Sequence, residues 1–273
     1  MNARFGATDR LVPVIGQGTW QVASRGAAAD EVVRTLQRGL DLGLTHVDTA
    51  ELYTGAEALV AKAIAGRRDA VFLVSKVHPR NASRTGTIAA CEQSLRRLGT
   101  DHLDVYLHHW PDGSHPISET MAGLHALVQA GKTRHIGVSN YDVPELEEAL
   151  AALDGVPLVC NQVLYNLDER GIEPAVLPWC EAHDVAVVGY TPFANQRMFR
   201  PGVRGFDVLD RIATRLGRTP RQVALRFLTR RPSLFAIPKA SSLAHVEENA
   251  GGQDFDLTVE DIAAIDGAFP GVP

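Results

Sequence analysis

Short apolar runs alternate with longer amphipathic segments along nearly the whole chain. In residues 30–42, for example, the apolar side chains Val32, Leu36 and Leu40 recur at helical intervals, and Gly43 follows the segment. Recurrence every three to four residues predicts an amphipathic helix, and a glycine just after it is typical of a helix end. Strand-length apolar runs that alternate with such helices favour a parallel sheet covered by helices.

This alternation covers the chain from its first residues to its last. We expect a small hairpin over residues 4–15, and then strands over residues 15–20, 45–48, 71–75, 103–108, 133–138, 158–163, 185–190 and 234–237. We expect helices over residues 30–42, 56–65, 85–98, 117–130, 144–153, 173–183, 207–216, 220–230, 243–250 and 258–267. Such a series of strand–helix units predicts an α/β fold, a (β/α)8 TIM barrel with a short N-terminal hairpin and extra C-terminal helices.

A doubly wound sheet is the competing architecture for this pattern. No Gly-x-Gly-x-x-Gly sequence follows a predicted strand, which weakens that interpretation. The length suits one barrel, and neither a low-complexity tract nor an obvious linker divides the chain. We therefore expect a single domain over residues 1–273.

The composition excludes several classes of partner. The formal net charge is −5 with both signs interspersed, so we expect no nucleic acid and no anionic membrane as a partner. No apolar run approaches the ~18 residues that a membrane span needs, and no apolar signal region follows Met1. Cys91, Cys160 and Cys180 share no metal-ligand spacing, so we expect no metal and a reducing, cytoplasmic location. No long exposed apolar stretch is evident, which favours a monomer.

Ionisable side chains stand at the C-terminal ends of three successive predicted strands. The first strand ends on Asp48, and Tyr53 follows in the next loop. The next two strands lead to Lys76 and to His109. Because the C-terminal strand ends of a β/α barrel share one mouth, where the chemistry takes place, we expect these side chains to lie together.

Together, these groups could serve carbonyl reduction. A free tyrosine has a pKa of about 10, and a lysine beside the phenol favours the phenolate and lowers that pKa. Tyr53 would act as the general acid, and Lys76 would lower its pKa. Asp48 would pair with the lysine, and His109 would orient the carbonyl. Each has a structural alternative when taken alone: a turn carboxylate, a packed phenol, a solvated lysine or a buried histidine. Their joint placement favours the functional interpretation.

Motifs at successive strand ends resemble those of one family. They are Gly16-Gln17-Gly18-Thr19-Trp20, Asp48-Thr49-Ala50 with Tyr53, Ser75-Lys76, residues 103–111, residues 131–140, Asn161-Gln162, Tyr190-Thr191-Pro192, and Ile237-Pro238-Lys239 with Glu248-Asn249. In this order they resemble the aldo-keto reductase family over nearly the whole chain, most closely its short bacterial members, which reduce methylglyoxal and similar small aldehydes. The resemblance implies a catalytic tetrad of Asp48, Tyr53, Lys76 and His109.

The resemblance also implies NADPH as the cofactor. Amide and hydroxyl groups at the ends of the fifth and sixth strands would hold the carboxamide, Tyr190 would stack on the nicotinamide ring, and Glu248 and Asn249 would reach the adenine. Lys239 and the serine pair after it precede a predicted helix, whose N-terminus attracts phosphate; simple helix capping is the alternative for the serines. The full expected cofactor set is Gly18, Thr19, Trp20, Asp48, Ser139, Asn140, Gln162, Tyr190, Thr191, Pro192, Lys239, Ser241, Ser242, His245, Glu248 and Asn249.

Two positions depart from the pattern of the family. Six residues after Lys239, many members carry an arginine that clamps the 2′-phosphate of NADP, but this chain has His245. Histidine is mostly neutral at pH 7 and cannot form a bidentate fork, so NADH is also possible. Residues 193–200, at the start of the 193–205 loop, lack the small-residue pattern of a cofactor-covering loop.

Aromatic residues next to the expected mouth predict the walls of a substrate pocket. We expect Trp20, Trp110 and Phe193 to form these walls, with Tyr53 and His109 beside the reacting carbonyl. The chain ends soon after the last predicted helix, so we expect an open pocket for small aldehydes or α-dicarbonyls. Two other functions are considered, an NADP(H)-binding regulatory subunit with little turnover and a barrel that acts on a phosphorylated substrate.

Overall fold

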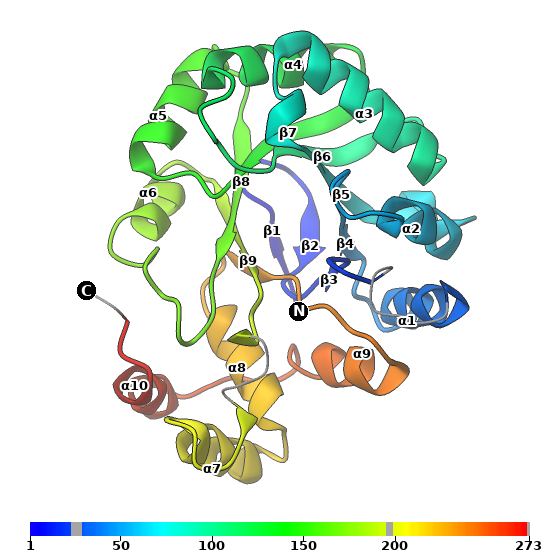
Figure 1. The fold of residues 1–273 in the computed structure, drawn as a ribbon. Helices are drawn as coiled ribbons and strands as arrows, with labels where there is room; N and C mark the ends of the chain where they lie inside the picture. The colour runs from blue at the N-terminus through cyan, green and yellow to red at the C-terminus, as the bar shows by residue number, and fades with distance from the viewer. Residues whose placement is uncertain (23–28, 195–198, 272–273) are drawn as a thin grey trace.

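The computed structural model of this chain describes residues 1–22, 29–194 and 199–271. Its main sheet has eight parallel strands in sequential order, so the predicted α/β barrel is confirmed (Figure 1). A bridge between Ile15 and Ala236 joins the first and last edges of the sheet, and the amide of Gly16 donates to the carbonyl of Ala236 at 2.8 Å. The strands are β3 (Gln17–Gly18), β4 (His46–Asp48), β5 (Phe72–Val77), β6 (Leu103–His108), β7 (Thr133–Ser139), β8 (Leu158–Leu164), β9 (Ala186–Tyr190) and β10 (Leu234–Ala236).

Helices surround the strands, as the alternation predicts (Figure 1). They are α1 (Ala29–Asp41), α2 (Ala56–Ile64), α3 (Arg84–Leu98), α4 (Ile117–Gln129), α5 (Val143–Ala152), α6 (Val176–Ala182), α7 (Phe206–Leu216), α8 (Pro220–Leu228), α9 (Leu243–Ala250) and α10 (Val259–Ala268). Two short 3-10 helices, η1 (Arg68–Ala70) and η2 (Pro79–Asn81), flank β5. Side-chain caps explain several of the boundaries, because Asp142, Thr219 and Thr258 each form a capping box at a helix start.

The first barrel strand is shorter than its predicted range. Residues 15–20 contribute only Gln17 and Gly18 to β3. The segment is confined between its two neighbours, since a Cβ on Gly16 would lie 2.7 Å from the carbonyl oxygen of His46, and one on Gly18 would lie 2.5 Å from that of Ile237. Glycine at both positions therefore lets the backbone pass close to β4 and to the chain after β10.

An antiparallel hairpin covers the end of the barrel opposite the mouth. It consists of β1 (Asn2–Arg4) and β2 (Leu11–Pro13), and so begins two residues before the predicted range. Phe5, between the two strands, is fully buried, with its ring centroid 4.8 Å from that of Phe72 and 4.9 Å from that of Phe235. These aromatic contacts fill the floor of the barrel with apolar side chains.

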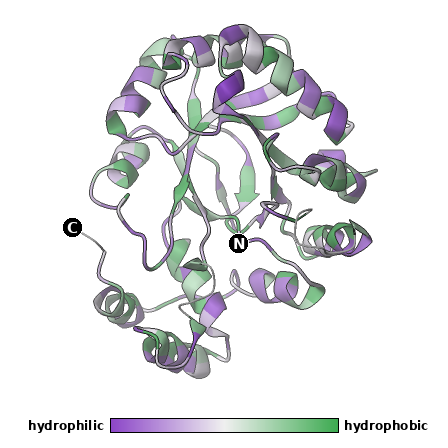
Figure 2. Cartoon of the chain, in the orientation of Figure 1, coloured by the Kyte–Doolittle hydropathy of each residue, from purple (hydrophilic) through white to green (hydrophobic). Residues whose placement is uncertain are grey.

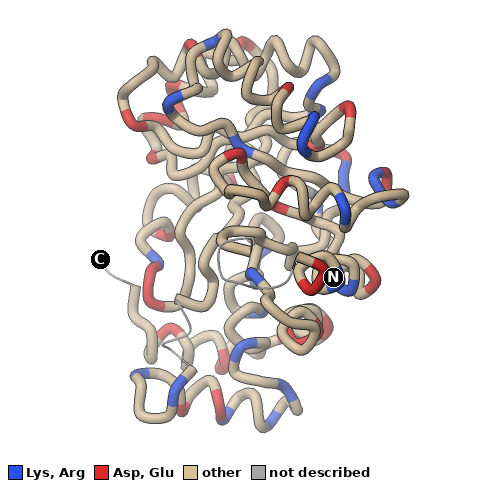
Figure 3. Tube along the Cα trace, turned by 45° about the vertical axis from the view of Figure 1, so that its right-hand side comes forward, with Lys and Arg blue, Asp and Glu red and all other residues tan. Residues whose placement is uncertain are grey.

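The outer helices mix residues of different polarity and charge. Figure 2 shows that the outer helices carry both hydrophilic and hydrophobic residues, and Figure 3 shows acidic and basic residues interspersed along them. Within the described ranges, none of the helices combines the length and the apolar character that crossing a bilayer requires.

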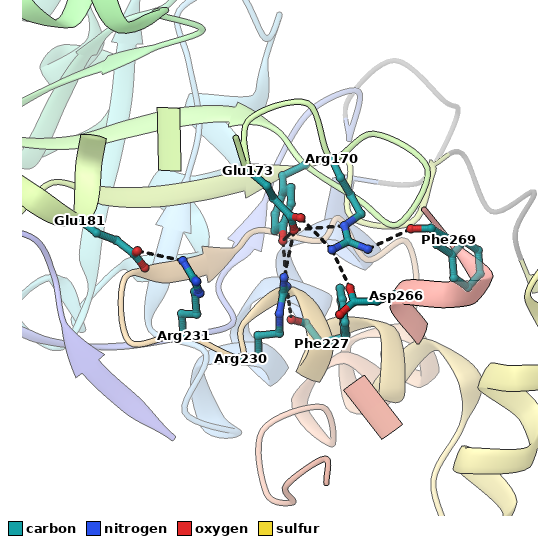
Figure 4. A network of polar contacts seen from close by, with 9 residues as sticks. Arg170, Glu173, Glu181, Phe227, Arg230, Arg231, Asp266 and Phe269 are labelled. Carbon is teal, nitrogen blue, oxygen red and sulfur yellow. Dashed lines mark hydrogen bonds and ion pairs between the residues drawn. The ribbon is translucent and has the colours of Figure 1, made fainter. Parts of the chain in front are cut away.

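A polar network joins α10 to the loop between β8 and α6 (Figure 4). Arg170, a buried residue of this loop, donates to both carboxylate oxygens of Glu173, at 3.1 and 2.7 Å. The same guanidinium donates to the carboxylate of Asp266 at 2.7 Å and to the carbonyl of Phe269 at 2.9 Å. One arginine therefore donates to a carbonyl and a carboxylate at the end of α10 and ties this helix to the barrel.

The end of α8 joins the same network. Arg230 donates to Glu173 at 3.0 Å and to the hydroxyl of Tyr165 at 2.9 Å, and this hydroxyl donates to Glu173 at 2.6 Å. In the following text, the α10 network means Tyr165, Arg170, Glu173, Arg230 and Asp266.

Candidate active site

The C-terminal ends of the barrel strands surround a cavity of about 570 Å³. Most of the residues that the sequence predicts for the site line it. They are Gly18, Thr19, Trp20, Asp48, Tyr53, His109, Trp110, Ser139, Asn140, Gln162, Tyr190, Thr191, Pro192, Phe193 and Lys239. Residues from distant parts of the sequence thus meet at the predicted mouth, because parallel strands deliver their ends to one side of the sheet.

Asp48, which lines this cavity, forms a buried ion pair with Lys76. Lys76, at the C-terminal end of β5, has a fully buried side chain and places Nζ 2.6 Å from Oδ1 of Asp48 and 2.9 Å from the carbonyl oxygen of Thr49. The other carboxylate oxygen of Asp48 accepts a hydrogen bond from Gln162 at 2.7 Å. Burial raises the pKa of Asp48, and Lys76 and Gln162 act against this shift. Two donors on opposite oxygens therefore hold the carboxylate in place.

Tyr53 lies above the ammonium group of this pair. Nζ of Lys76 is 5.0 Å from the centroid of the phenol ring. Burial raises the pKa of Tyr53, while Lys76 lowers it by attraction to the phenolate. The net direction is opposite to the one expected from the sequence, because desolvation exceeds the effect of the lysine. The lysine itself nevertheless acts in the expected sense.

His109 completes the group of ionisable side chains at the cavity. Its ring centroid is 5.6 Å from that of Tyr53, and burial lowers the pKa of His109 to about 2, with a further lowering by Lys76. A neutral imidazole can donate one ring N–H to a carbonyl oxygen. The preceding His108 is turned elsewhere, with Nδ1 at 2.7 Å from the hydroxyl of Tyr141, so only one of the adjacent histidines faces the mouth, as alternation along β6 predicts.

Hydrogen-bonding side chains form the opposite wall of the cavity. The hydroxyl of Tyr190 donates to Oδ1 of Asn140 at 2.9 Å, and the amide of Asn140 donates to Ser139 at 3.1 Å and to the carbonyl of His109 at 3.2 Å. Asn140 and Thr191 have φ values of 61° and 53°, which are uncommon for residues other than glycine. Strained backbone of this kind often occurs where a ligand is bound.

The remaining cofactor candidates lie beyond the lining of this cavity, around the start of α9 and along it. Ser242 caps α9 by accepting a hydrogen bond from the amide of His245 at 3.3 Å, which is the capping alternative considered for the serines. Glu248 lies 3.8 Å from Arg221, and Asn249 is buried. Ser241 directly precedes the cap.

The cavity also includes residues that the sequence analysis did not select. Gln21, Leu52 and Ile237 line it, and Leu52 exposes 43% of its surface although it is apolar. Its position directly before Tyr53 is the signal that could have identified it. Of the 193–205 loop, Phe193 packs edge-on against Phe199 at 5.4 Å, and residues 195–198 lie outside the described residues.

Metal ligation finds no support in residues 1–22, 29–194 and 199–271. In these ranges, three or more His, Cys, Asp or Glu side chains nowhere gather in a way that could hold a metal ion. The thiols of Cys91, Cys160 and Cys180 are free and buried.

Comparison with known proteins gives extensive matches. The Aldo/keto reductase family matches residues 14–269. Methylglyoxal reductase YeaE of Escherichia coli (strain K12) is 42% identical over 264 residues, which cover 96% of this chain and 93% of that protein. Methylglyoxal reductase DkgB of Salmonella typhi is 31% identical over 263 residues, covering 93% of each.

Solved structures agree with these sequence matches. An aldo-keto reductase from Klebsiella pneumoniae in complex with NADPH has a TM-score of 0.93 at 42% identity, covering 99% of this chain and 95% of the other. The thermostable aldo-keto reductase Tm1743, in complex with the inhibitor epalrestat, has a TM-score of 0.91 at 35% identity, covering 98% of this chain and 99% of the other.

Proposed function

Because the chain belongs to the aldo/keto reductase family, we propose that it reduces small aldehydes or α-dicarbonyls such as methylglyoxal with NADPH, and that Tyr53 is the general acid. The chain is an NAD(P)H-dependent oxidoreductase. The observation that carries the finer proposal is the convergence of Tyr53, Asp48 and His109 on one cavity, with Lys76 paired to Asp48 beneath the Tyr53 ring. The single-domain organisation and the monomeric state remain predictions.

The proposed reaction needs a proton donor for the carbonyl oxygen. The nicotinamide, when bound, supplies the hydride to the carbonyl carbon. Tyr53 donates its phenolic proton to the oxygen as negative charge develops there, and the Lys76 ammonium stabilises the phenolate that remains. Neutral His109 donates a hydrogen bond to the same oxygen and orients the carbonyl. Asp48 holds the ammonium beneath the phenol.

The donor set of the cavity fits a nicotinamide nucleotide. Ser139, Asn140 and Gln162 offer hydroxyl and amide groups for a carboxamide, and Tyr190 offers a ring face beside them. Lys239 lines the same cavity and precedes α9, so a cationic side chain and a helix N-terminus lie in sequence for phosphate groups. We propose NADPH as the preferred cofactor, with NADH also accepted because His245 cannot form a bidentate phosphate contact.

The walls of the cavity favour a small substrate. Trp20, Leu52, Trp110 and Phe193 give it apolar sides, and Tyr53 and His109 give it a polar floor. The names of the relatives point to methylglyoxal as the first compound to try.

The test is cofactor oxidation by the purified protein, followed at 0.1 mM NADPH with methylglyoxal and with aromatic aldehydes. We expect steady turnover of at least some small aldehydes and faster turnover with NADPH than with NADH. Quenching of tryptophan fluorescence by NADPH without turnover of any aldehyde would contradict the reductase proposal and favour a regulatory subunit. Absence of any NADPH binding would instead contradict the cofactor assignment.

A further inference from the structure

Glu51 lies in the loop that connects Asp48 to Tyr53, but it does not line the cavity. Its carboxylate is directed toward the chain that leaves β5. Oε1 accepts a hydrogen bond from the backbone amide of His78, and the side-chain amide of Asn81 donates to both carboxylate oxygens, at 3.1 and 3.2 Å. One side chain therefore joins the loop after β4 to the first turn after β5.

The contacts of Glu51 fall on the lysine at the end of β5 and on residues that follow it. The backbone amide of Glu51 donates to the carbonyl of Lys76 at 3.3 Å, and its carboxylate holds the amide two residues further on. The ammonium of Lys76 binds the same loop through the carbonyl of Thr49 at 2.9 Å. Glu51 supplies two of these three links, one through its backbone amide and one through its carboxylate.

We propose that Glu51 is a positioning residue that fixes the loop carrying Tyr53 against the strand end carrying Lys76. The proposal rests on the proposed function, in which the phenol donates a proton and the lysine stabilises the phenolate. The attraction between the ammonium and the phenolate depends on their separation, and a misplacement of about 1 Å can cost up to a hundredfold in rate. Glu51 touches neither the cavity nor the cofactor wall, so its loss should affect the proton transfer and not cofactor binding.

A second contact extends the effect of Glu51 to the substrate wall. The ring of His78 packs edge-on against Trp110 with centroids 5.2 Å apart, and Trp110 packs against His109 at 4.6 Å. The carboxylate that holds the backbone of His78 therefore also supports the two rings beside the reacting carbonyl.

The proposal predicts a separation of kinetic constants in Glu51→Ala. We expect kcat to fall about tenfold to a hundredfold while the Kd of NADPH stays at the wild-type value. The alkaline limb of the kcat profile should also move to higher pH, because a more distant Lys76 lowers the pKa of Tyr53 less. Asp48, Tyr190 and His109 also face this phenol, and the substitution changes none of them. Glu51→Gln retains an acceptor for His78 and should stay within a few-fold of wild type.

A matched control is available at the other end of the barrel. Glu181 also joins two segments, accepting from Arg231 and Ser233 at 2.8 and 2.7 Å (Figure 4 shows the first contact). Glu181→Ala removes a comparable clamp and should leave kcat and its pH profile unchanged. If Glu51→Ala folds poorly, Asn81→Ala removes part of the same clamp and should lower kcat by a smaller factor, again at unchanged Kd.

The outcomes distinguish this proposal from the function on which it rests. Wild-type kcat in Glu51→Ala, with Tyr53→Phe inactive, would overturn the positioning role and leave the reductase intact. A parallel loss of kcat, cofactor affinity and melting temperature without rescue by Glu51→Gln would also overturn it, since that pattern indicates a general structural role. Full activity of Tyr53→Phe would overturn the proposed proton donor, and the role of Glu51 with it.

Discussion

Two groups of charged residues in this barrel are arranged in opposite ways. In the α10 network, Glu173 accepts hydrogen bonds from Arg170, Arg230 and Tyr165 (Figure 4). Burial raises the pKa of Glu173, but the hydrogen bonds from these donors together outweigh burial and lower the pKa to about 2. At the mouth, burial prevails, and it raises the pKa values of Asp48 and Tyr53 despite the ammonium of Lys76.

This difference indicates which group serves stability and which serves chemistry. A carboxylate saturated by two guanidinium groups keeps its charge over the whole physiological range and has little proton-transfer capacity. A phenol and a carboxylate that share one ammonium beside a cavity have competing influences on their protonation, which is typical of functional sites. We therefore infer that the α10 network fastens the C-terminal helix and that the mouth carries the reaction.

The largest effect is expected from Lys76→Met, which acts on both stability and activity. The variant leaves Asp48 buried without its cation and leaves the phenol of Tyr53 without its stabilising charge. We expect the free energy of unfolding to fall by about 3 kcal/mol. We also expect kcat to fall by about a thousandfold. Urea unfolding and aldehyde reduction measure the two quantities, and near-wild-type kcat would break the assignment of the mouth.

Glu173→Gln should affect stability alone. It removes one of the two carboxylates that pair with Arg170, while Asp266 remains, so we expect a loss of about 2 kcal/mol in the free energy of unfolding at pH 7. kcat measured well below the melting temperature should stay within twofold of wild type. A loss of kcat much larger than this would show that the α10 network also serves the reaction.

The same variant predicts a pH dependence of stability. The folded-state pKa of Glu173 lies below its ordinary value of 4.5, so its stabilising contribution is complete above about pH 4.5 and is lost as the pH falls toward 2. The stability difference between wild type and Glu173→Gln should shrink over this interval, because glutamine does not titrate. Urea midpoints of both proteins at pH 6, 4 and 3 check this, and a constant difference would contradict the assigned cause.

A smaller effect, on cofactor affinity, is expected from a substitution near the start of α9, after Lys239 in the sequence. His245→Arg supplies the planar fork that the 2′-phosphate of NADP can accept, so we expect about tenfold tighter NADPH binding with little change for NADH. Fluorescence titration of both cofactors measures the ratio of their dissociation constants. An unchanged ratio would show that this position does not meet the 2′-phosphate.

The fold was predictable because its signals are local. Apolar runs and helix caps specify the strand–helix alternation, and the strand ends that carry Asp48, Lys76 and His109 follow directly from it. The length of the first strand was overestimated. Gly16 and Gly18 are there because the backbone passes close to neighbours that are distant in sequence, which the local pattern does not show. The net direction of the Tyr53 pKa was also missed, because desolvation depends on how tightly the folded chain encloses the ring.

Contacts between distant residues were beyond the reach of the sequence pattern. Arg170 and Asp266 are 96 positions apart, and neither belongs to a motif. Glu51 stands inside the motif around Asp48, but its bond to Asn81 spans 30 positions and becomes visible only when the loops after β4 and β5 meet. Such pairs follow from the folded geometry and not from periodicity.

The comparison between the two regions is tested most directly by the activity and cofactor affinity of Tyr53→Phe, measured on one preparation. The phenylalanine keeps the ring above Lys76 and removes only the proton donor. We predict that kcat falls by about a thousandfold while the Kd of NADPH and the melting temperature stay close to wild type. Wild-type kcat with unchanged cofactor binding would contradict the account, because the reaction would then draw its proton from another group.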